Sequence, residues 1–210
     1  MLLIVTQVVY CHYRYTYTAK KFSLHALAGL SEKQVAAHIG LYEGYVKHVN
    51  LIAERLSAVR SGELTLDPYI VSELRRRFAF EFDGMRMHEY YFTQLEGGSA
   101  PLNDASLFAQ SITDKYGSTE RFIEHIKEVA GTRGIGWVVV YYDAVASSMH
   151  TIFVADHELG QLSGLPIVFA LDLWEHAFMV DYLPAEKKQY IDAFLQNINW
   201  KVVEERFATL

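Results

Sequence analysis

The stretch FALDLWEHAFMVDY, residues 169–182, places two groups that can bind a metal directly after an apolar run. Asp172 ends LPIVFALD, which has the composition of a buried strand, and His176 follows four residues later among aromatic side chains. Burying a carboxylate and an imidazole is unfavourable unless their charge and hydrogen-bonding demands are balanced. A metal ion would balance both, so Asp172 and His176 are candidate metal ligands.

Two further histidines lie on the apolar faces of segments with helical periodicity. His38 shares a face with Tyr42 and Val49, and His88 lies on the apolar stripe of a second helix. A single histidine in such a place usually only packs into the core, but three of them with one buried acid make a ligand set. Three imidazoles and one carboxylate suit iron or manganese, and also zinc.

The segments that carry His38 and His88 are typical of a helical hairpin. Ser31 is followed three residues later by Gln34, which is the pattern of a capping box at the start of a helix over residues 30–56. Asp67 as N-cap and Pro68 at the first helical position predict a second helix that continues to about residue 95. The short polar turn between them predicts that the two helices are antiparallel.

The second half of the chain has a different composition. EGGSAPLND interrupts the helical pattern and marks a domain boundary. Two shorter helices are predicted over 105–116 and 119–129, the second closed by Gly131 as a C-cap. GWVVVYYD, MHTIFVAD and LPIVFALD predict a three-stranded antiparallel sheet, and the tail returns to helix near Pro184.

We therefore predict an α+β fold with two domains. Residues 1–97 would form an N-terminal extension and helical hairpin domain, and residues 98–210 an α/β domain with a three-stranded antiparallel sheet. About half of the 210 residues are apolar, which is enough to build a sizeable core. The opening MLLIVTQVVY is too short to span a bilayer and lacks the features of a signal peptide, so we expect a short extension or an edge strand.

Composition excludes several kinds of partner and site. The net charge of -6, without clustered basic residues, argues against nucleic-acid binding. No stretch reaches the roughly 18 uninterrupted apolar residues of a membrane span. Cys11 is the single cysteine, so neither a disulfide within the chain nor a cysteine-based zinc site can form, and a reducing, cytoplasmic location is expected.

The letters around the candidate ligands resemble the iron/manganese superoxide dismutase family. DLWEHAF, followed by DY and later by NW, is similar to the family's D-x-W-E-H-A-[YF] and N-W signatures. HIGLYEGYVKHVN resembles the first-helix motif, MHEYYF the ligand segment of the second helix, and GIGWVVV the G-S-G-W strand. The order of the motifs agrees from about Tyr17 to Phe207, so the resemblance covers nearly the whole chain.

The resemblance implies a metal site and a reaction. The implied ligands are His38, His88, Asp172 and His176, around one iron or manganese ion per chain with solvent in the fifth position. The implied reaction converts superoxide to dioxygen and hydrogen peroxide by redox cycling of that ion.

Further residues acquire roles from the same resemblance. Tyr45 corresponds to the tyrosine at the substrate gateway. A glutamine that normally bonds the metal-bound solvent is absent from the second helix, where Gly84 stands, and the role passes to His157 in the loop after the second strand. Glu175, which pairs in the family with a ligand histidine of the other subunit, implies a homodimer.

The chain also departs from the family pattern. Tyr42 and Glu43 replace the usual paired histidines, so the gate for protons and substrate must differ. Met179 stands where a tyrosine normally reaches across the dimer interface. The spacing from His38 to Tyr45 is one residue shorter than usual, which predicts that the π-bulge of the first helix is lost.

Other functions compete with the dismutase reading. A mononuclear non-haem iron oxygenase would use two histidines and one carboxylate, which leaves one inward histidine without a task. A zinc hydrolase would need a general base that no residue obviously provides. A metal-binding relative without catalytic activity is the third alternative. The choice between iron and manganese stays open, because the ligands are common to both ions and outer residues tune the potential.

Overall fold

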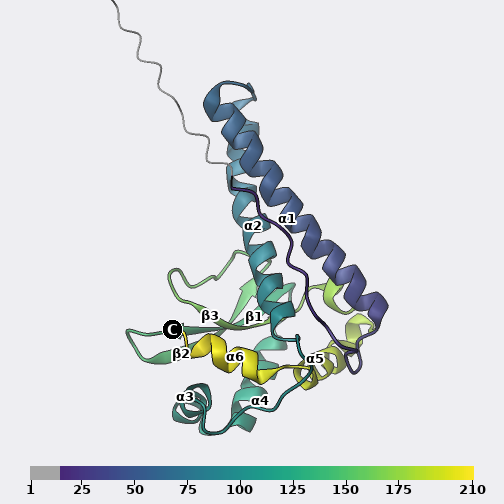
Figure 1. Cartoon of the computed structure of the whole chain (residues 1–210), viewed down its shortest axis with the longest axis vertical. Coiled ribbons are helices and arrows are strands. Elements are labelled where there is room, and N and C mark those ends of the chain that lie inside the picture. The colour runs from purple at the N-terminus through teal and green to yellow at the C-terminus, as the bar shows by residue number, and fades with distance from the viewer. Residues whose placement is uncertain (1–14) are drawn as a thin grey trace, which may run out of the picture.

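Two long helices and a small sheet are the main elements of the structure. The computed structural model describes residues 15–210, so the expected extension or edge strand at residues 1–10 lies outside the described residues. Figure 1 shows the helices α1 (Glu32–Ser61) and α2 (Pro68–Thr93) side by side as a hairpin. The other elements are α3 (Leu107–Tyr116), α4 (Thr119–Ala130), β1 (Gly136–Asp143), β2 (Ser148–Ala155), β3 (Ile167–Asp172), the 3₁₀ turns η1 (Glu175–Ala177) and η2 (Pro184–Glu186), α5 (Lys187–Gln196) and α6 (Trp200–Phe207). The predicted α+β fold is confirmed.

The first helix starts where the sequence predicts. The hydroxyl of Ser31 accepts a hydrogen bond from the backbone N–H of Gln34 at 3.1 Å, as an N-cap should. A capping box also requires the side chain of Gln34 to accept from the backbone N–H of Ser31. This part of the prediction is wrong, because the backbone N–H of Ser31 donates to Asp181 Oδ2 at 2.6 Å. Helix α1 then runs to Ser61 without a π-bulge, as its short spacing predicts.

The sheet matches its prediction and has β1 at its centre. Its order is β2-β1-β3, and both pairings are antiparallel. In this register Trp137 on β1 lies opposite Val154 on β2 and Asp172 on β3. Residues 136–141 of β1 are buried, which explains why this strand is continuously apolar.

The hairpin and the sheet share one hydrophobic core. Helix α2 contacts β3. Helix α3 contacts β2, α4 contacts β1 and β2, and α6 contacts β3, and all of them contribute to the same core. In Figure 1 the sheet and these helices therefore lie around the base of the hairpin. Phe169 on β3 stacks on Trp200 of α6 with ring centroids 5.8 Å apart.

The segment before α1 follows the hairpin toward its base. The backbone N–H of Tyr17 donates to Asn50 Oδ1 at 2.8 Å, and Asn197 Nδ2 donates to the carbonyl of Ala28 at 2.7 Å. Figure 1 shows this path as the purple coil that descends along α1 and α2. The segment thus connects the hairpin to the helices at the end of the chain.

The tail and one helix end differ in detail from the prediction. The tail is two helices rather than one, because Asn197 ends α5 and Trp200 starts α6. Gly131 is the C-cap of α4, but its φ of -72° is right-handed and does not require glycine. None of the helices in residues 15–210 has both the length and the apolar character needed to cross a membrane.

Candidate metal centre

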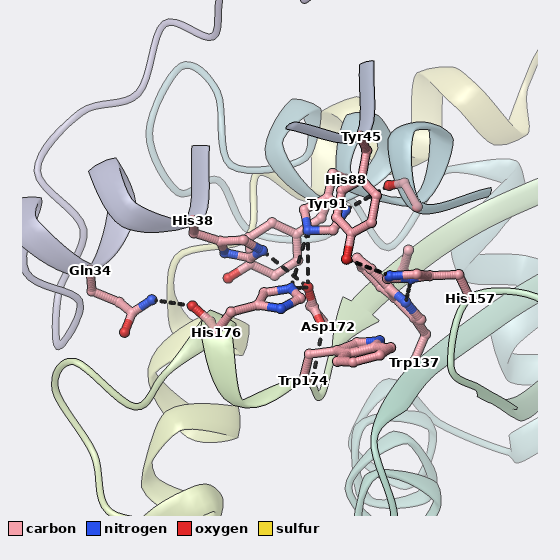
Figure 2. Close-up of polar contacts among 12 residues, drawn as sticks. Gln34, His38, Tyr45, His88, Tyr91, Trp137, His157, Asp172, Trp174 and His176 are labelled. Atoms are coloured by element: carbon pink, nitrogen blue, oxygen red, sulfur yellow. Dashed lines mark hydrogen bonds and ion pairs between the residues drawn. The ribbon is translucent and has the colours of Figure 1, made fainter. Parts of the chain in front are cut away.

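Four side chains from four elements converge at the base of the hairpin. His38 comes from α1, His88 from α2, Asp172 from the end of β3 and His176 from η1 (Figure 2). One nitrogen or oxygen of each lies within 4.8 Å of those of the others. His38, His88 and Asp172 are buried, and His176 is half-buried. The structure therefore brings together all four of the predicted ligands.

The distances among these atoms fit neighbouring ligands of a single ion. His38 Nε2 lies 3.0 Å and His176 Nε2 3.1 Å from Asp172 Oδ2. His88 Nε2 lies 3.3 Å from His176 Nε2 and 3.5 Å from Asp172 Oδ2. Ligand atoms about 2.1 Å from an ion and about 90–109° apart are separated by about 3.0–3.4 Å, and these four separations are close to that range.

The tautomer of His88 gives an independent reason for a cation here. His88 Nδ1 lies 2.6 Å from the carbonyl of Gly84, which can only accept, so this nitrogen carries the hydrogen of the neutral ring. Nε2 then presents a lone pair to the carboxylate oxygen of Asp172 in a fully buried place. Two electron-rich atoms in such contact repel each other unless a cation lies between them, so the donor set fits a metal ion.

Burial and charge set the protonation states of the group. Burial lowers the pKa of His38 and lowers that of His88 well below its ordinary value. Burial alone would raise the pKa of Asp172, but His176 and His38 hold it well below its usual range. The site thus contains a carboxylate beside two imidazoles, those of His38 and His88, that resist protonation, and these are the forms that bind metals.

Hydrogen bonds hold Asp172 in this orientation. The backbone N–H of Trp174 donates to Asp172 Oδ1 at 2.8 Å, which leaves Oδ2 facing the imidazoles. The hydroxyl of Tyr190 on α5 donates to the backbone carbonyl of Asp172 at 2.7 Å. The end of β3 is therefore fixed from both its side chain and its main chain.

Gln34 holds the segment that carries His176, a role that the sequence did not suggest. Its side-chain Nε2 donates to the carbonyl of His176 at 2.7 Å (Figure 2). Its Oε1 accepts from the backbone N–H of Val180 at 2.9 Å. Gln34 is 1% exposed. A glutamine three residues after an N-cap serine has a local explanation, and no local signal reveals a partner 142 residues away.

His157 lies beside the four-residue group and connects it to Tyr45. Trp137 Nε1 donates to His157 Nδ1 at 2.9 Å, and His157 Nε2 lies 2.7 Å from the hydroxyl of Tyr45. An indole N–H can only donate, so Nδ1 accepts and the hydrogen of the neutral ring is on Nε2. His157 therefore donates to the oxygen of Tyr45.

Both partners in this bond are neutral near pH 7. Burial lowers the pKa of His157 to about 4. Burial, and then the charge of Asp172, raises the pKa of Tyr45 above its ordinary value. The pair therefore presents a neutral hydroxyl beside the site.

The glycine that replaces the second-helix glutamine makes room for Tyr45. A Cβ atom at Gly84 would lie 2.7 Å from Cδ1 and 2.9 Å from Cε1 of the Tyr45 ring. The ring of Tyr45 itself packs 5.1 Å from that of His88 between centroids. Gly84 is thus required by the position of Tyr45, and no larger side chain fits there without displacing the ring.

Of the other residues discussed with the family pattern, Tyr42 packs against the four-residue group, with its ring centroid 6.4 Å from that of His88, and Glu43, Glu175 and Met179 lie at the surface. Tyr42 is fully buried and donates to Glu89 Oε1 at 3.2 Å, while Glu43 is exposed. Met179 is 49% exposed, and Glu175 is also exposed. Tyr42 is therefore bound within the fold rather than placed at an opening to solvent.

Comparison with protein families identifies one that matches the second half of the chain. Residues 104–206 match the family described as iron/manganese superoxide dismutases, C-terminal domain. This range includes Asp172 and His176.

Similar proteins extend the match into the helical hairpin. The iron superoxide dismutase of Cupriavidus metallidurans is 34% identical over 188 residues, which are 87% of this chain and 90% of that protein. The iron superoxide dismutase of Saccharolobus solfataricus is 29% identical over 80% of both chains. A manganese superoxide dismutase of Mycolicibacterium paratuberculosis is 30% identical over 81% of both. The relatives therefore include proteins named for each of the two metals.

Proposed function

Because the chain belongs to the iron/manganese superoxide dismutase family and is a superoxide dismutase with one iron or manganese ion per chain, we propose that four residues hold that ion: His38, His88, Asp172 and His176. The observation that carries the assignment is the buried contact of His88 Nε2 with Asp172 Oδ2 at 3.5 Å. A lone pair and a carboxylate at this distance need a cation between them. His38 and His176 complete the set around the same oxygen.

The chain's own residues prepare the site for one-electron chemistry. When bound, the ion supplies a redox couple through which one superoxide is oxidised to dioxygen and a second, with two protons, is reduced to hydrogen peroxide. Asp172 contributes the single negative charge among the ligands and so offsets part of the charge of the ion. The Trp174 N–H holds Oδ1 and keeps Oδ2 directed at the imidazoles.

His157 and Tyr45 position a proton next to the ligands. His157 Nε2–H occupies an acceptor position on the Tyr45 oxygen, which leaves the hydroxyl hydrogen of Tyr45 for an oxygen atom of solvent or substrate. The high pKa of Tyr45 keeps that hydrogen in place near pH 7. We assign Tyr45 as the residue that donates hydrogen bonds to superoxide or peroxide in the site. Trp137 and Tyr45 occupy both ring nitrogens of His157, so we assign His157 as the residue that orients Tyr45, in place of the expected bond to the metal-bound solvent.

Aromatic rings enclose this pair. The ring of Trp174 stacks on His157 with centroids 4.8 Å apart, and the ring of Phe80 meets His157 edge-on at 4.7 Å. Together with Trp137 they limit the access of bulk water around the hydrogen bond from His157 to Tyr45. A lower local dielectric strengthens that bond and the charge interactions at the ion.

We further propose that the protein is a homodimer with Glu175 at the interface. Glu175 is exposed and directly precedes the ligand His176, and the nearby apolar side chains of Met179 and Val180 are 49% and 43% exposed. A second copy of this face would cover them. Light scattering should give twice the chain mass of 24.0 kDa, and Glu175→Ala should shift the protein toward monomer. A monomeric wild type, or a dimer unaffected by Glu175→Ala, would contradict this arrangement. Glu54→Ala on the exposed face of α1 is the matched control.

The location and the domain division are also proposed. We place the protein in the cytoplasm, because its one cysteine needs no oxidising compartment, and cell fractionation against a cytoplasmic marker tests this.

We assign residues 1–97 and 98–210 to two domains that each supply two ligands. Removal of the ion should then increase proteolytic cleavage between them, at residues 96–104. Equal cleavage with and without metal would count against the division.

The deciding experiment measures superoxide consumption by metal-free, iron-loaded and manganese-loaded protein, with the metal content of each determined. We expect turnover in at least one loaded form and none without metal. One ion per chain without turnover would identify a metal-binding relative that lacks activity. His88→Ala should abolish metal retention, and a variant with full metal content and wild-type activity would remove His88 from the ligand set.

A further inference from the structure

A polar pocket separate from the proposed metal site lies between the segment before α1, helix α2 and helix α6. It has a volume of about 310 Å³, and its lining is Lys20, Arg86, Glu89, Tyr90, Thr93 and Arg206. None of these residues belongs to the proposed ligand set or to the hydrogen bonds between Trp137, His157 and Tyr45. The pocket therefore needs an explanation of its own.

This pocket carries more positive than negative charge. Lys20 Nζ lies 3.2 Å and Arg86 NH1 2.7 Å from the same oxygen, Oε2, of Glu89. Arg206 adds a third cation, so three positive groups meet one carboxylate and the local sum is +2. The surplus occurs in a chain with a net charge of -6, so it is not part of a generally basic surface.

Arg206 has no acidic partner within residues 15–210. Its guanidinium lies 4.7 Å from the centroid of the Tyr90 ring and donates one hydrogen bond, at 2.6 Å, to the carbonyl of Val168. Burial lowers its pKa to about 10, which leaves it charged near pH 7. A guanidinium has five N–H donors, and the bond to Val168 uses one of them. A partly desolvated cation with unused donors is a common feature of anion sites.

We propose that this pocket binds a phosphate group, either as free phosphate or as a small phosphate monoester, through Arg206, Lys20 and Arg86. A phosphate monoester near pH 7 carries a charge of about -1.5 to -2, which matches the local surplus. Arginine and lysine are the usual partners of phosphate oxygens, and Arg206 can present two parallel N–H groups. The volume is at the lower end of small-molecule pockets and exceeds the needs of phosphate alone, so a short organic substituent also fits.

Titration calorimetry of the metal-loaded protein tests the site. Inorganic phosphate and glycerol 3-phosphate are the two probes, each titrated at constant ionic strength set with chloride so that screening of exposed charges does not change. We expect saturable binding with one site per chain. Tighter binding of the monoester would identify the organic phosphate as the ligand, and tighter binding of inorganic phosphate would identify the free ion.

Variants distinguish this pocket from general charge attraction. Arg206→Gln should weaken phosphate binding about tenfold or more, because hydrogen bonds between charged groups are among the strongest in proteins. Lys20→Gln, at a largely exposed side chain, should also weaken it and is not expected to disturb folding. Lys201→Gln is the control, since Lys201 lies on α6, is 73% exposed and is not part of the lining.

Two results would overturn the proposal. One is the absence of saturable binding of either probe to the wild type. The other is equal weakening by Lys201→Gln and Lys20→Gln, which would show that phosphate responds only to net charge.

Discussion

Trp137 donates a hydrogen bond to His157 Nδ1 at 2.9 Å and thereby determines which nitrogen of that imidazole carries the hydrogen. The opposite nitrogen, Nε2, lies 2.7 Å from the hydroxyl of Tyr45. The indole of Trp137 on β1 therefore makes His157 the donor in its hydrogen bond to Tyr45, although Trp137 is not part of that bond. This relationship turns a residue that would suit any hydrophobic core into one with a specific effect on the site.

Trp137→Phe should lower activity while the protein keeps its metal. Without the indole N–H, His157 can carry its hydrogen on either nitrogen, and the orientation of the Tyr45 hydroxyl is lost for part of the population. A net hydrogen bond is worth about 0.5–1.5 kcal/mol, so turnover per bound ion should fall between about twofold and about tenfold. Superoxide consumption normalised to metal content measures this. Trp200→Phe, at a partly buried position beside Phe169, is the control. Wild-type turnover in Trp137→Phe would show that the tautomer does not matter.

Gly84→Ala should displace the Tyr45 ring. The added Cβ would come within 2.7 Å of that ring, and overpacking of this kind costs about 1–3 kcal/mol of stability. The bond from His157 to Tyr45 should be lost, so turnover should fall as well. Urea unfolding and superoxide consumption are the measurements.

Gly40→Ala is the matched control for that change. Gly40 is an exposed residue of α1, and a Cβ there would meet nothing within 4 Å. Alanine in a helix should stabilise the protein by about 0.4–1 kcal/mol without altering activity. If Gly84→Ala and Gly40→Ala changed the stability and the activity equally, the Tyr45 ring would move aside without a cost in free energy.

The elements of this fold follow from local signals in the sequence. Asp67 and Pro68 mark the start of α2 because a cap residue and a ring-fixed φ favour that position in any context. Runs of β-branched and aromatic residues predict the three strands, and the run of β1 is buried throughout residues 136–141 because β1 has a strand on each side and is covered on both faces. Such signals are short-range and can be recognised without knowledge of the fold.

The contacts of the site are long-range, and this limits what the sequence predicts. Gln34 satisfies a capping pattern in the letters, yet its side chain holds His176. The position of His157 depends on a loop in which Asp156 has a φ of 51°, a left-handed conformation that a non-glycine residue seldom adopts. Residue types near a motif can suggest that His157 matters, but only the folded loop gives it Trp137 as a partner.

Gln34→Ala should weaken metal binding although Gln34 is not a proposed ligand. The substitution leaves the carbonyl of His176 and the N–H of Val180 without their partner, at a cost of about 1–3 kcal/mol in stability. Loss of such an outer contact typically lowers metal affinity about 10- to 100-fold. Competition with a chelator measures the affinity, and Gln110→Ala on the exposed side of α3 is the control. Unchanged metal affinity in Gln34→Ala would show that the segment holds His176 without this side chain.

Asp83→Asn should stabilise the protein at neutral and alkaline pH but much less in acid. Burial and the neighbouring charge of Glu158 raise the pKa of Asp83 to about 6, whereas an unfolded aspartate has a pKa of about 3.9. The folded protein thus holds this proton more tightly than the unfolded chain, so the carboxyl favours folding at low pH and this advantage is lost as the pH rises from about 4 to about 6. Asparagine does not titrate, so the variant does not lose this stability as the pH rises. Urea unfolding of the metal-loaded variant and wild type at pH 4.5, 6 and 8 should therefore give a stability gain that grows with pH. Asp104→Asn in the exposed loop before α3 is the control, and a gain that is constant across the three pH values would contradict the assignment.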